Sequence, residues 1–278
     1  VRPDIAVISN IGDAHIEFLG SREGILKAKS EIFQNLKPDG VAILNGDDPL
    51  LNGLDLPFTT IRCGQSAHCN VRVTDILDHG VAGITCTVTT ARDTYVLRIP
   101  APGEHMVYSA SMAVAIAELL HLNHAEIIRG VEAYQPAGSR MRVIQLPEER
   151  CILDDCYNAN PQSVSAALEI LARTECDRKV AVLGDMGELG DLTAQAHYNM
   201  GALATMLGID FVVAIGEKAA MIADGAVESG GEAYHFATKE EAIRELAGQL
   251  APNTAMLVKA SHAMHFEWIV EELCKAYD

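Results

Sequence analysis

The sequence predicts an α/β protein made of two domains. Strand-like apolar runs alternate with helical patterns through the second half, and the opening segment is strand–helix–strand. The length of 278 residues and an apolar fraction of 49% are sufficient for two hydrophobic cores. We expect a first domain over residues 1–137 and a second over residues 138–278.

The first domain is expected to combine an α/β opening with a small β-rich subsheet. After the opening, short β-branched runs separated by Gly and Asp favour a small, largely antiparallel sheet. In order, the expected elements are a strand at Ile5–Ser9, a helix within Asn10–Phe33, a strand and turn at Gly40–Pro49, short strands between Thr59 and Pro100, and helices at Ser109–Leu122 and Ala125–Ala133.

The second domain is expected to be Rossmann-like. Gln135–Arg140 carries Pro and Gly between periodic segments and is the candidate linker. Alternating strands and helices beyond it predict a doubly wound, mostly parallel sheet with helices on both faces. The strands are expected at Cys151–Asp154, Lys179–Leu183, Phe211–Ile215, Ala233–Phe236 and Ala255–Lys259, and the helices at Pro161–Thr174, Thr193–Leu207, Lys218–Ser229, Lys239–Leu250 and Phe266–Ala276.

One lysine of the first predicted helix stands out. On a helical wheel, Lys29 falls in the same stripe as the apolar residues from Ile25 to Leu36. A buried ammonium is costly unless it is paired, neutralised or modified, so Lys29 either snorkels to the helix edge or has a function. His15 follows the first strand, and together with neighbouring acids and Lys29 it forms a candidate metal site.

Polar residues follow several predicted strands of the second domain, where ligands of such sheets collect. In "DDCYNANPQS", Asn160 can cap a helix, but this does not explain Asp155 and Asn158, which suggest a nucleotide or substrate turn. The Gly-rich "GDMGELGD" fits a plain turn or a close approach to a ligand. In "KASHAMH", Lys259 can hold an anion or remain a solvated loop lysine.

Composition excludes several classes of protein. The formal charge of −17 argues against a general nucleic-acid or membrane-surface binder. No window approaches a membrane span, no signal peptide is evident, and the seven cysteines lack a disulfide framework, so we expect a cytoplasmic protein with reduced thiols. The chain starts almost at a strand without Met and lacks any Gly-Lys dipeptide of a Walker loop, which suggests a piece of a longer protein.

Motifs along the whole chain resemble those of the Mur ligases, which form amide bonds in peptidoglycan precursors. They are "RPDIAVISNIGDAH", "AKSEIF", "LNGDD", "PGEH", "SRM", "DDCYNANPQS", "GDMGELG" and "LVKASH". The resemblance is strongest to the branch that adds D-alanyl-D-alanine. It implies the later part of the family's central ATPase domain, followed by its whole C-terminal Rossmann-like domain.

The resemblance also implies a reaction. ATP phosphorylates the carboxylate of UDP-N-acetylmuramoyl-tripeptide, and the amine of D-Ala-D-Ala attacks the acyl phosphate. Two Mg²⁺ ions are expected to offset the charge on the phosphoryl group. His15 matches a metal-ligand histidine, and Lys29 matches a lysine that carries a CO₂-derived carbamate and thereby becomes an anionic metal ligand.

Further residues match binding positions of the family. For ATP the matches are Asn10, His105, Arg140, Asp155 and Asn158, and for the substrate Tyr157, Asn160, Lys259 and Ser261. The sequence departs from the family pattern at two places. Met106 and Ser109 replace asparagines near the adenine, and Ala260 and His262 replace the Gly and Arg of a Lys-Gly-Ser-Arg motif.

We therefore expect part of a monomeric ligase that is inactive without its N-terminal portion and takes UDP-N-acetylmuramoyl-tripeptide and D-Ala-D-Ala. Two alternatives remain open. The chain could be a non-catalytic nucleotide- or peptide-binding module, or it could belong to another Mur-type ligase that adds an amino acid.

Overall fold

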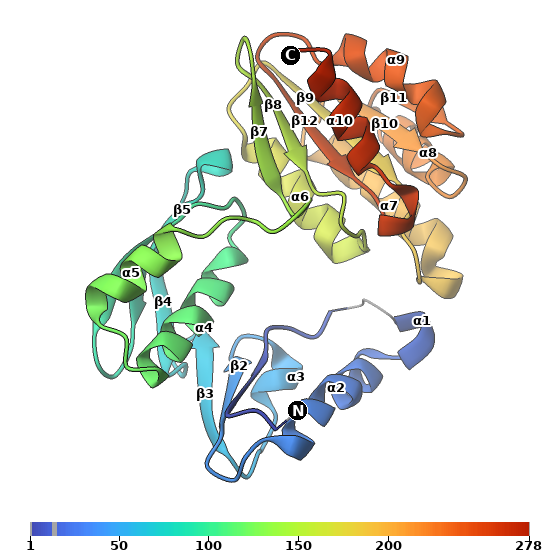
Figure 1. Ribbon diagram of the computed structural model, residues 1–278. Helices are drawn as coiled ribbons and strands as arrows, with labels where there is room; N and C mark the ends of the chain where they lie inside the picture. The colour runs from blue at the N-terminus through green and yellow to red at the C-terminus, as the bar shows by residue number, and fades with distance from the viewer. Residues whose placement is uncertain (1, 13–15, 278) are drawn as a thin grey trace. The chain divides into compact units, whose positions relative to one another are not determined.

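The computed structural model describes residues 2–12 and 16–277, which form two compact units that divide between Gln135 and Pro136. Each unit is built on its own six-stranded mixed sheet among the described residues (Figure 1). No regular secondary structure occurs between residues 134 and 141, where the linker is predicted. Within the described ranges, no helix is long and apolar enough to cross a membrane.

The sheet of the first unit has its strands in chain order. They are β1 (Ile5–Ile8), β2 (Val41–Asn45), β3 (Thr59–Gly64), β4 (Val71–Asp78), β5 (Ile84–Thr89) and β6 (Thr94–Ile99). Pairs from β1 to β4 are parallel, and only β4–β5 and β5–β6 are antiparallel. The prediction of a small subsheet starting near Thr59 is therefore wrong in part. β3 pairs in parallel with β2 on one side and with β4 on the other, where Cys63 pairs with Val71. β3 and β4 therefore extend the opening parallel sheet.

Helices cover both faces of this first sheet. They are α1 (Ile16–Leu19), α2 (Arg22–Ser30), α3 (Pro49–Asn52), α4 (Met106–Leu119) and α5 (His124–Glu132), with 3₁₀ turns η1 (Glu31–Asn35) and η2 (Gly80–Ala82). Alternate residues of β2 show which helices lie on which face, because neighbouring strand residues point to opposite faces of the sheet. Ala42 and Leu44 pack with α2, η1 and α3, whereas Ile43 packs with α4 and α5.

The second sheet has the strand order β11-β10-β9-β12-β8-β7, and only β7–β8 is antiparallel. Its strands are β7 (Arg142–Leu146), β8 (Arg150–Asp154), β9 (Arg178–Gly184), β10 (Phe211–Ile215), β11 (Ala233–Phe236) and β12 (Thr254–Lys259). Its helices are α6 (Pro161–Arg173), α7 (Thr193–Met206), α8 (Ala220–Glu228), α9 (Lys239–Gln249) and α10 (Glu267–Lys275), with 3₁₀ turns η3 (Gly190–Leu192) and η4 (His262–Met264). The predicted doubly wound topology is confirmed.

The order of this sheet decides where a site can form. The chain passes from β8 to β9 and outward to β11, and β12 then returns between β8 and β9. The segments that follow β8, β9 and β12 therefore meet at the carboxyl edge of adjacent parallel strands, the usual ligand position in such folds.

The sequence prediction missed β7. This strand pairs antiparallel with β8 through a tight turn in which Glu148 and Glu149 have φ of 59° and 58°. Hairpin turns with positive φ usually carry Asn or Gly, and neither is present here. The turn thus lacked its usual sequence signal.

Candidate functional site

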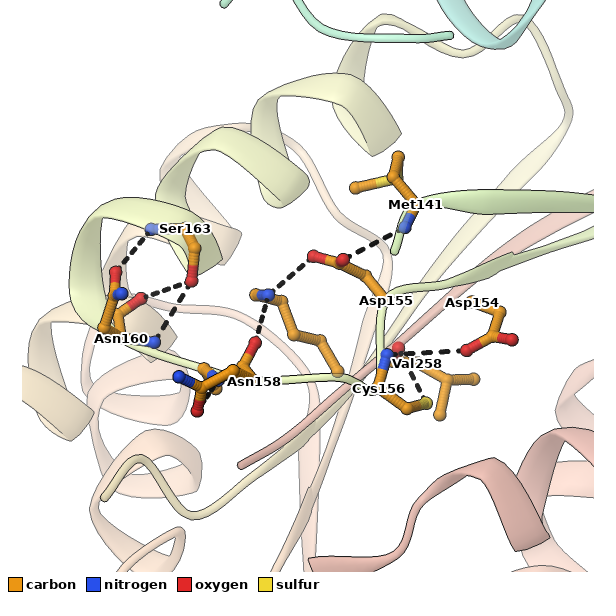
Figure 2. A network of polar contacts seen from close by, with 10 residues as sticks. Met141, Asp154, Asp155, Cys156, Asn158, Asn160, Ser163 and Val258 are labelled. Carbon is orange, nitrogen blue, oxygen red and sulfur yellow. Dashed lines mark hydrogen bonds and ion pairs between the residues drawn. The ribbon is translucent and has the colours of Figure 1, made fainter. Parts of the chain in front are cut away.

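A buried lysine organises the carboxyl edge of the second sheet. Lys259 ends β12, and its side chain is only 1% exposed. Its Nζ lies 2.5 Å from Asp155 Oδ2 and donates to the Asn158 carbonyl at 2.7 Å. Figure 2 shows this network, in which the segment after β8 folds back against β12. Of the two alternatives for Lys259, the solvated loop lysine is excluded, because the residue is the last of the buried strand β12.

The same carboxylate holds the beginning of the second unit. Asp155 Oδ1 accepts a hydrogen bond from the Met141 N–H at 3.0 Å, and the Tyr157 N–H donates to the Ser139 carbonyl at 2.9 Å. The Arg140 guanidinium carbon lies 3.6 Å from the centroid of the Tyr157 ring, which is 47% exposed. Arg140, Asp155 and Tyr157 therefore form one cluster, although 14 or more residues separate Arg140 from the other two.

The asparagines of the "YNANP" turn support its backbone. Asn160 accepts from the Ser163 N–H at 2.9 Å and forms a capping box at the start of α6, as its position before Pro161 predicts. Asn158 Oδ1 accepts from the Ala159 N–H at 2.9 Å, and the Asn158 residue is exposed. Asn160 thus has a structural function, while Asn158 remains accessible to a ligand.

Ser261 joins the segment after β12 to the Gly-rich turn after β9. Its hydroxyl donates to the Asp185 carbonyl at 2.7 Å and accepts from the Gly187 N–H at 2.8 Å. His197 of α7 supports the same turn, because its Nε2 accepts from the Met186 N–H at 2.9 Å. Burial lowers the pKa of His197 and favours this neutral form. "GDMGELG" is therefore a turn fixed by side chains from two other elements.

The first unit also carries polar groups at the carboxyl ends of its parallel strands. Lys29 is exposed, and its Nζ donates to the carbonyl oxygen of Asn10, just beyond β1, at 2.9 Å. The prediction that Lys29 lies on a buried helix face is wrong. Ile25, Phe33 and Leu36 of the predicted stripe are buried, but Ile32 is 40% exposed and the side chain of Lys29 extends out of the core to the Asn10 carbonyl. His15 lies outside the described residues.

Asp48 is a supporting residue that the sequence prediction missed. It is 8% exposed; Oδ2 accepts from the Ile11 N–H at 2.7 Å, and Oδ1 accepts from the N–H groups of Leu50 and Leu51. Arg22 holds the same segment by donating to the Ile11 carbonyl at 2.7 Å. An Asp before Pro in "LNGDDP" is a helix-start signal, but its hydrogen bond to Ile11, in the segment after β1, has no local signature.

The adjacent Asp47 ties β3 to the same edge. It accepts from the Gln65 and Ser66 N–H groups at 2.6 and 3.1 Å. Burial opposes ionisation of Asp47, but the hydrogen bonds from Ser66 and Gln65 outweigh it and lower the pKa of the carboxyl group. His105 is exposed and directly precedes α4. No group of three or more His, Cys, Asp or Glu side chains suited to a metal occurs within residues 2–12 and 16–277.

Two protein-family models match this chain. The model of the Mur ligase middle domain matches residues 1–117, and the model described as "Mur ligase, glutamate ligase domain" matches residues 139–262. The chain belongs to the Mur ligase family. Each matched range lies within one of the two units.

Two similar relatives carry the same name. The chain is 34% identical over 277 residues to UDP-N-acetylmuramoyl-tripeptide–D-alanyl-D-alanine ligase of Bacillus subtilis, covering 99% of this chain and 60% of the relative. It is 32% identical to the Escherichia coli ligase of the same name, covering 98% and 60%. The chain thus spans about three fifths of the length of these relatives.

Solved structures agree with the sequence comparison. A crystal structure of MurF from Acinetobacter baumannii matches with a TM-score of 0.88 and 33% identity, covering 99% of this chain and 61% of that one. MurF from Thermotoga maritima in complex with ADP has the same fold, with a TM-score of 0.84 at 23% identity, covering 99% and 64%. The α/β fold with two mixed sheets is that of the middle and C-terminal domains of these ligases.

Proposed function

We propose that this chain is the ATP-handling and amine-accepting part of a ligase that joins D-Ala-D-Ala to UDP-N-acetylmuramoyl-tripeptide. The observation that carries the proposal is the cluster of Arg140, Asp155 and Tyr157, in a chain similar over 99% of its length to ligases of that name. The same cluster would suit a nucleotide, because it combines a fixed carboxylate, a guanidinium and an exposed aromatic ring.

The residues are suited to ATP in specific ways. A carboxylate has about four lone-pair positions, and Asp155 uses one on each oxygen for Lys259 and Met141, so it can accept further bonds from ribose hydroxyls. Arg140 supplies a planar cation for phosphate. We assign Asn10, His105 and Asn158 to the nucleotide as well, on the strength of the family motifs and of their exposure.

The first unit would supply the metal side of the reaction. Lys29 is exposed and thus accessible to CO₂, and a carbamate on its Nζ would be an oxygen ligand of the type Mg²⁺ prefers, beside the Asn10 carbonyl. His15 would be the second ligand. Bound Mg²⁺ would offset the negative charge of the transferred phosphoryl group.

The proposed reaction has two steps. A carboxylate oxygen of the tripeptide attacks the γ-phosphorus of ATP, and the bond to ADP breaks. The amine of D-Ala-D-Ala then attacks the acyl carbon, loses a proton, and releases phosphate with that same carboxylate oxygen. The family motifs assign Tyr157, Asn160, Lys259 and Ser261 to the substrate side of the second unit, and Tyr157 is the exposed member of this set.

We propose that the complete protein acts as a monomer in the cytoplasm, which fits the seven reduced thiols. The alternative is a non-catalytic nucleotide- or peptide-binding module. An assay of phosphate release with ATP, Mg²⁺, UDP-N-acetylmuramoyl-tripeptide and D-Ala-D-Ala, using the complete protein, separates the two. A ligase releases phosphate only when both UDP-N-acetylmuramoyl-tripeptide and D-Ala-D-Ala are present. A non-catalytic module binds ADP but releases no phosphate, and that result would reject the proposal.

A further inference from the structure

Lys259 has an unusual position for a residue of a binding site. It occupies the last position of a strand whose six residues are all buried, and its side chain is 1% exposed. A buried ammonium persists only with an ionic partner and further acceptors. Asp155 Oδ2 at 2.5 Å and the Asn158 carbonyl at 2.7 Å meet this need from within the protein.

The neighbouring carboxylate, that of Asp154, does not pair with Lys259. Asp154 is fully buried, but its Oδ2 accepts from Arg142 at 2.9 Å and its Oδ1 from the Cys156 N–H at 3.4 Å. Lys259 therefore pairs with Asp155 specifically. Two of the three ammonium N–H groups are thus used within the protein, and a side chain that is 1% exposed offers a ligand almost no surface.

The pair connects three separate segments. Lys259 comes from β12, Asp155 and Asn158 come from the turn after β8, and the second oxygen of Asp155 accepts from Met141. Met141 directly follows Arg140, which stacks on Tyr157. In Figure 2 a dashed line joins the Asp155 carboxylate to Met141. Orientation of the Asp155 carboxylate thus depends on the ammonium of Lys259.

We infer that Lys259 is a positioning residue for nucleotide binding: it fixes the Asp155 carboxylate and the turn that carries Tyr157, and it does not contact D-Ala-D-Ala. The inference rests on the proposed function insofar as Asp155 and Arg140 are assigned to ATP. It differs from the substrate contact that the sequence resemblance implies for Lys259.

The test is a double-mutant cycle in the complete protein, with Lys259→Met, Asp155→Asn and the double variant. ADP affinity is measured by calorimetry with Mg²⁺, and KM for D-Ala-D-Ala by phosphate release. Lys179→Met is the control, because Lys179 is a half-buried lysine of the neighbouring strand β9 that also donates to a backbone carbonyl, that of Ala172, but at the opposite end of the sheet.

We expect Lys259→Met to weaken ADP binding about tenfold and to leave KM for D-Ala-D-Ala within about twofold of wild type, the scale of one lost orienting contact. The double variant should bind ADP as Asp155→Asn does. The Lys179→Met control should match wild type in both measurements.

Two results would overturn the inference. One is a raised KM for D-Ala-D-Ala with unchanged ADP affinity, which indicates direct substrate contact. The other is a double variant that binds ADP more weakly than Asp155→Asn, because Lys259 then acts independently of Asp155. If Lys259→Met does not fold, the inference is tested by comparing the ADP affinity of the double variant, in which the charges still balance, with that of Asp155→Asn. If wild type binds ADP but forms no amide, the proposed function fails while the ADP cycle remains interpretable.

Discussion

Replacement of Asp48 by alanine is a direct test of how the first unit holds its candidate metal edge. Asp48 is 8% exposed and accepts three backbone N–H groups, those of Ile11, Leu50 and Leu51. Loss of a helix cap costs about 1 kcal/mol, and a buried N–H left unsatisfied costs about 1–3 kcal/mol. Ile11 and Leu51 are at most 1% exposed, so water cannot readily replace the carboxylate.

We therefore expect Asp48→Ala to destabilise the first unit by about 2–4 kcal/mol, which lowers its unfolding midpoint by roughly 8–15 °C. Asp48→Asn should fall between wild type and alanine. Its single amide oxygen can serve the helix start or Ile11, but its NH₂ group then faces the other donor.

Thermal unfolding followed by far-UV circular dichroism, together with hydrogen exchange at the Ile11 amide, measures the effect. Trp268, the only tryptophan of the sequence, belongs to the second unit, so its fluorescence reports that unit separately. The exposed Asp55 provides the control variant Asp55→Ala. Unchanged exchange at Ile11 and an unchanged midpoint in Asp48→Ala would refute the reasoning.

Three further predictions concern single groups. Burial lowers the pKa of His197, so below pH about 6.5 the unfolded chain binds a proton that the folded chain does not. The stability of the second unit should therefore fall as the pH drops from 7 to 5.5, and it should fall less steeply in His197→Gln. Equal slopes for the two proteins, measured by Trp268 fluorescence, would contradict this. Burial raises the pKa of Cys63 to about 12 and those of Cys86 and Cys151 to about 11, so a thiol reagent at pH 8 should label the half-buried Cys176 and Cys274 first; early labelling of Cys63, seen by peptide mapping, would be inconsistent with this structure. In the complete protein, Lys29→Ala should lower phosphate release by orders of magnitude, with partial rescue by small carboxylates, whereas Lys27→Ala on the same helix should remain active; near-normal turnover of Lys29→Ala would exclude the carbamate.

The fold was predictable where local periodicity and topology agree. All five parallel strands of the second sheet and their helices follow from alternating apolar runs, because a buried parallel strand needs a continuous apolar stretch. The missed strand β7 lies at the sheet edge and is followed by two glutamates with positive φ, a turn without its usual residues. The parallel pairing of β3 with β4 depends on tertiary packing, and no local pattern reports it.

The candidate site was predictable in its residues more than in their roles. The polar residues after β8 and β12 do gather at one edge, since parallel strands bring their carboxyl ends together. The burial of Lys259 and the exposure of Lys29 were not predictable. The first depends on a partner 104 positions away, and the second on the Asn10 carbonyl, 19 positions away, to which the Lys29 side chain extends. Asp48 and His197 act through backbone N–H groups, which sequence patterns do not reveal.

Transfer of an oxygen atom is the most direct test of the proposed ligase reaction. UDP-N-acetylmuramoyl-tripeptide labelled with ¹⁸O in the reacting carboxylate is incubated with the complete protein, ATP, Mg²⁺ and D-Ala-D-Ala, and the released phosphate is analysed by mass spectrometry. An acyl phosphate predicts one ¹⁸O atom in each phosphate, formed together with the amide product and absent when D-Ala-D-Ala is omitted. Unlabelled phosphate, or phosphate without the amide, would contradict the account.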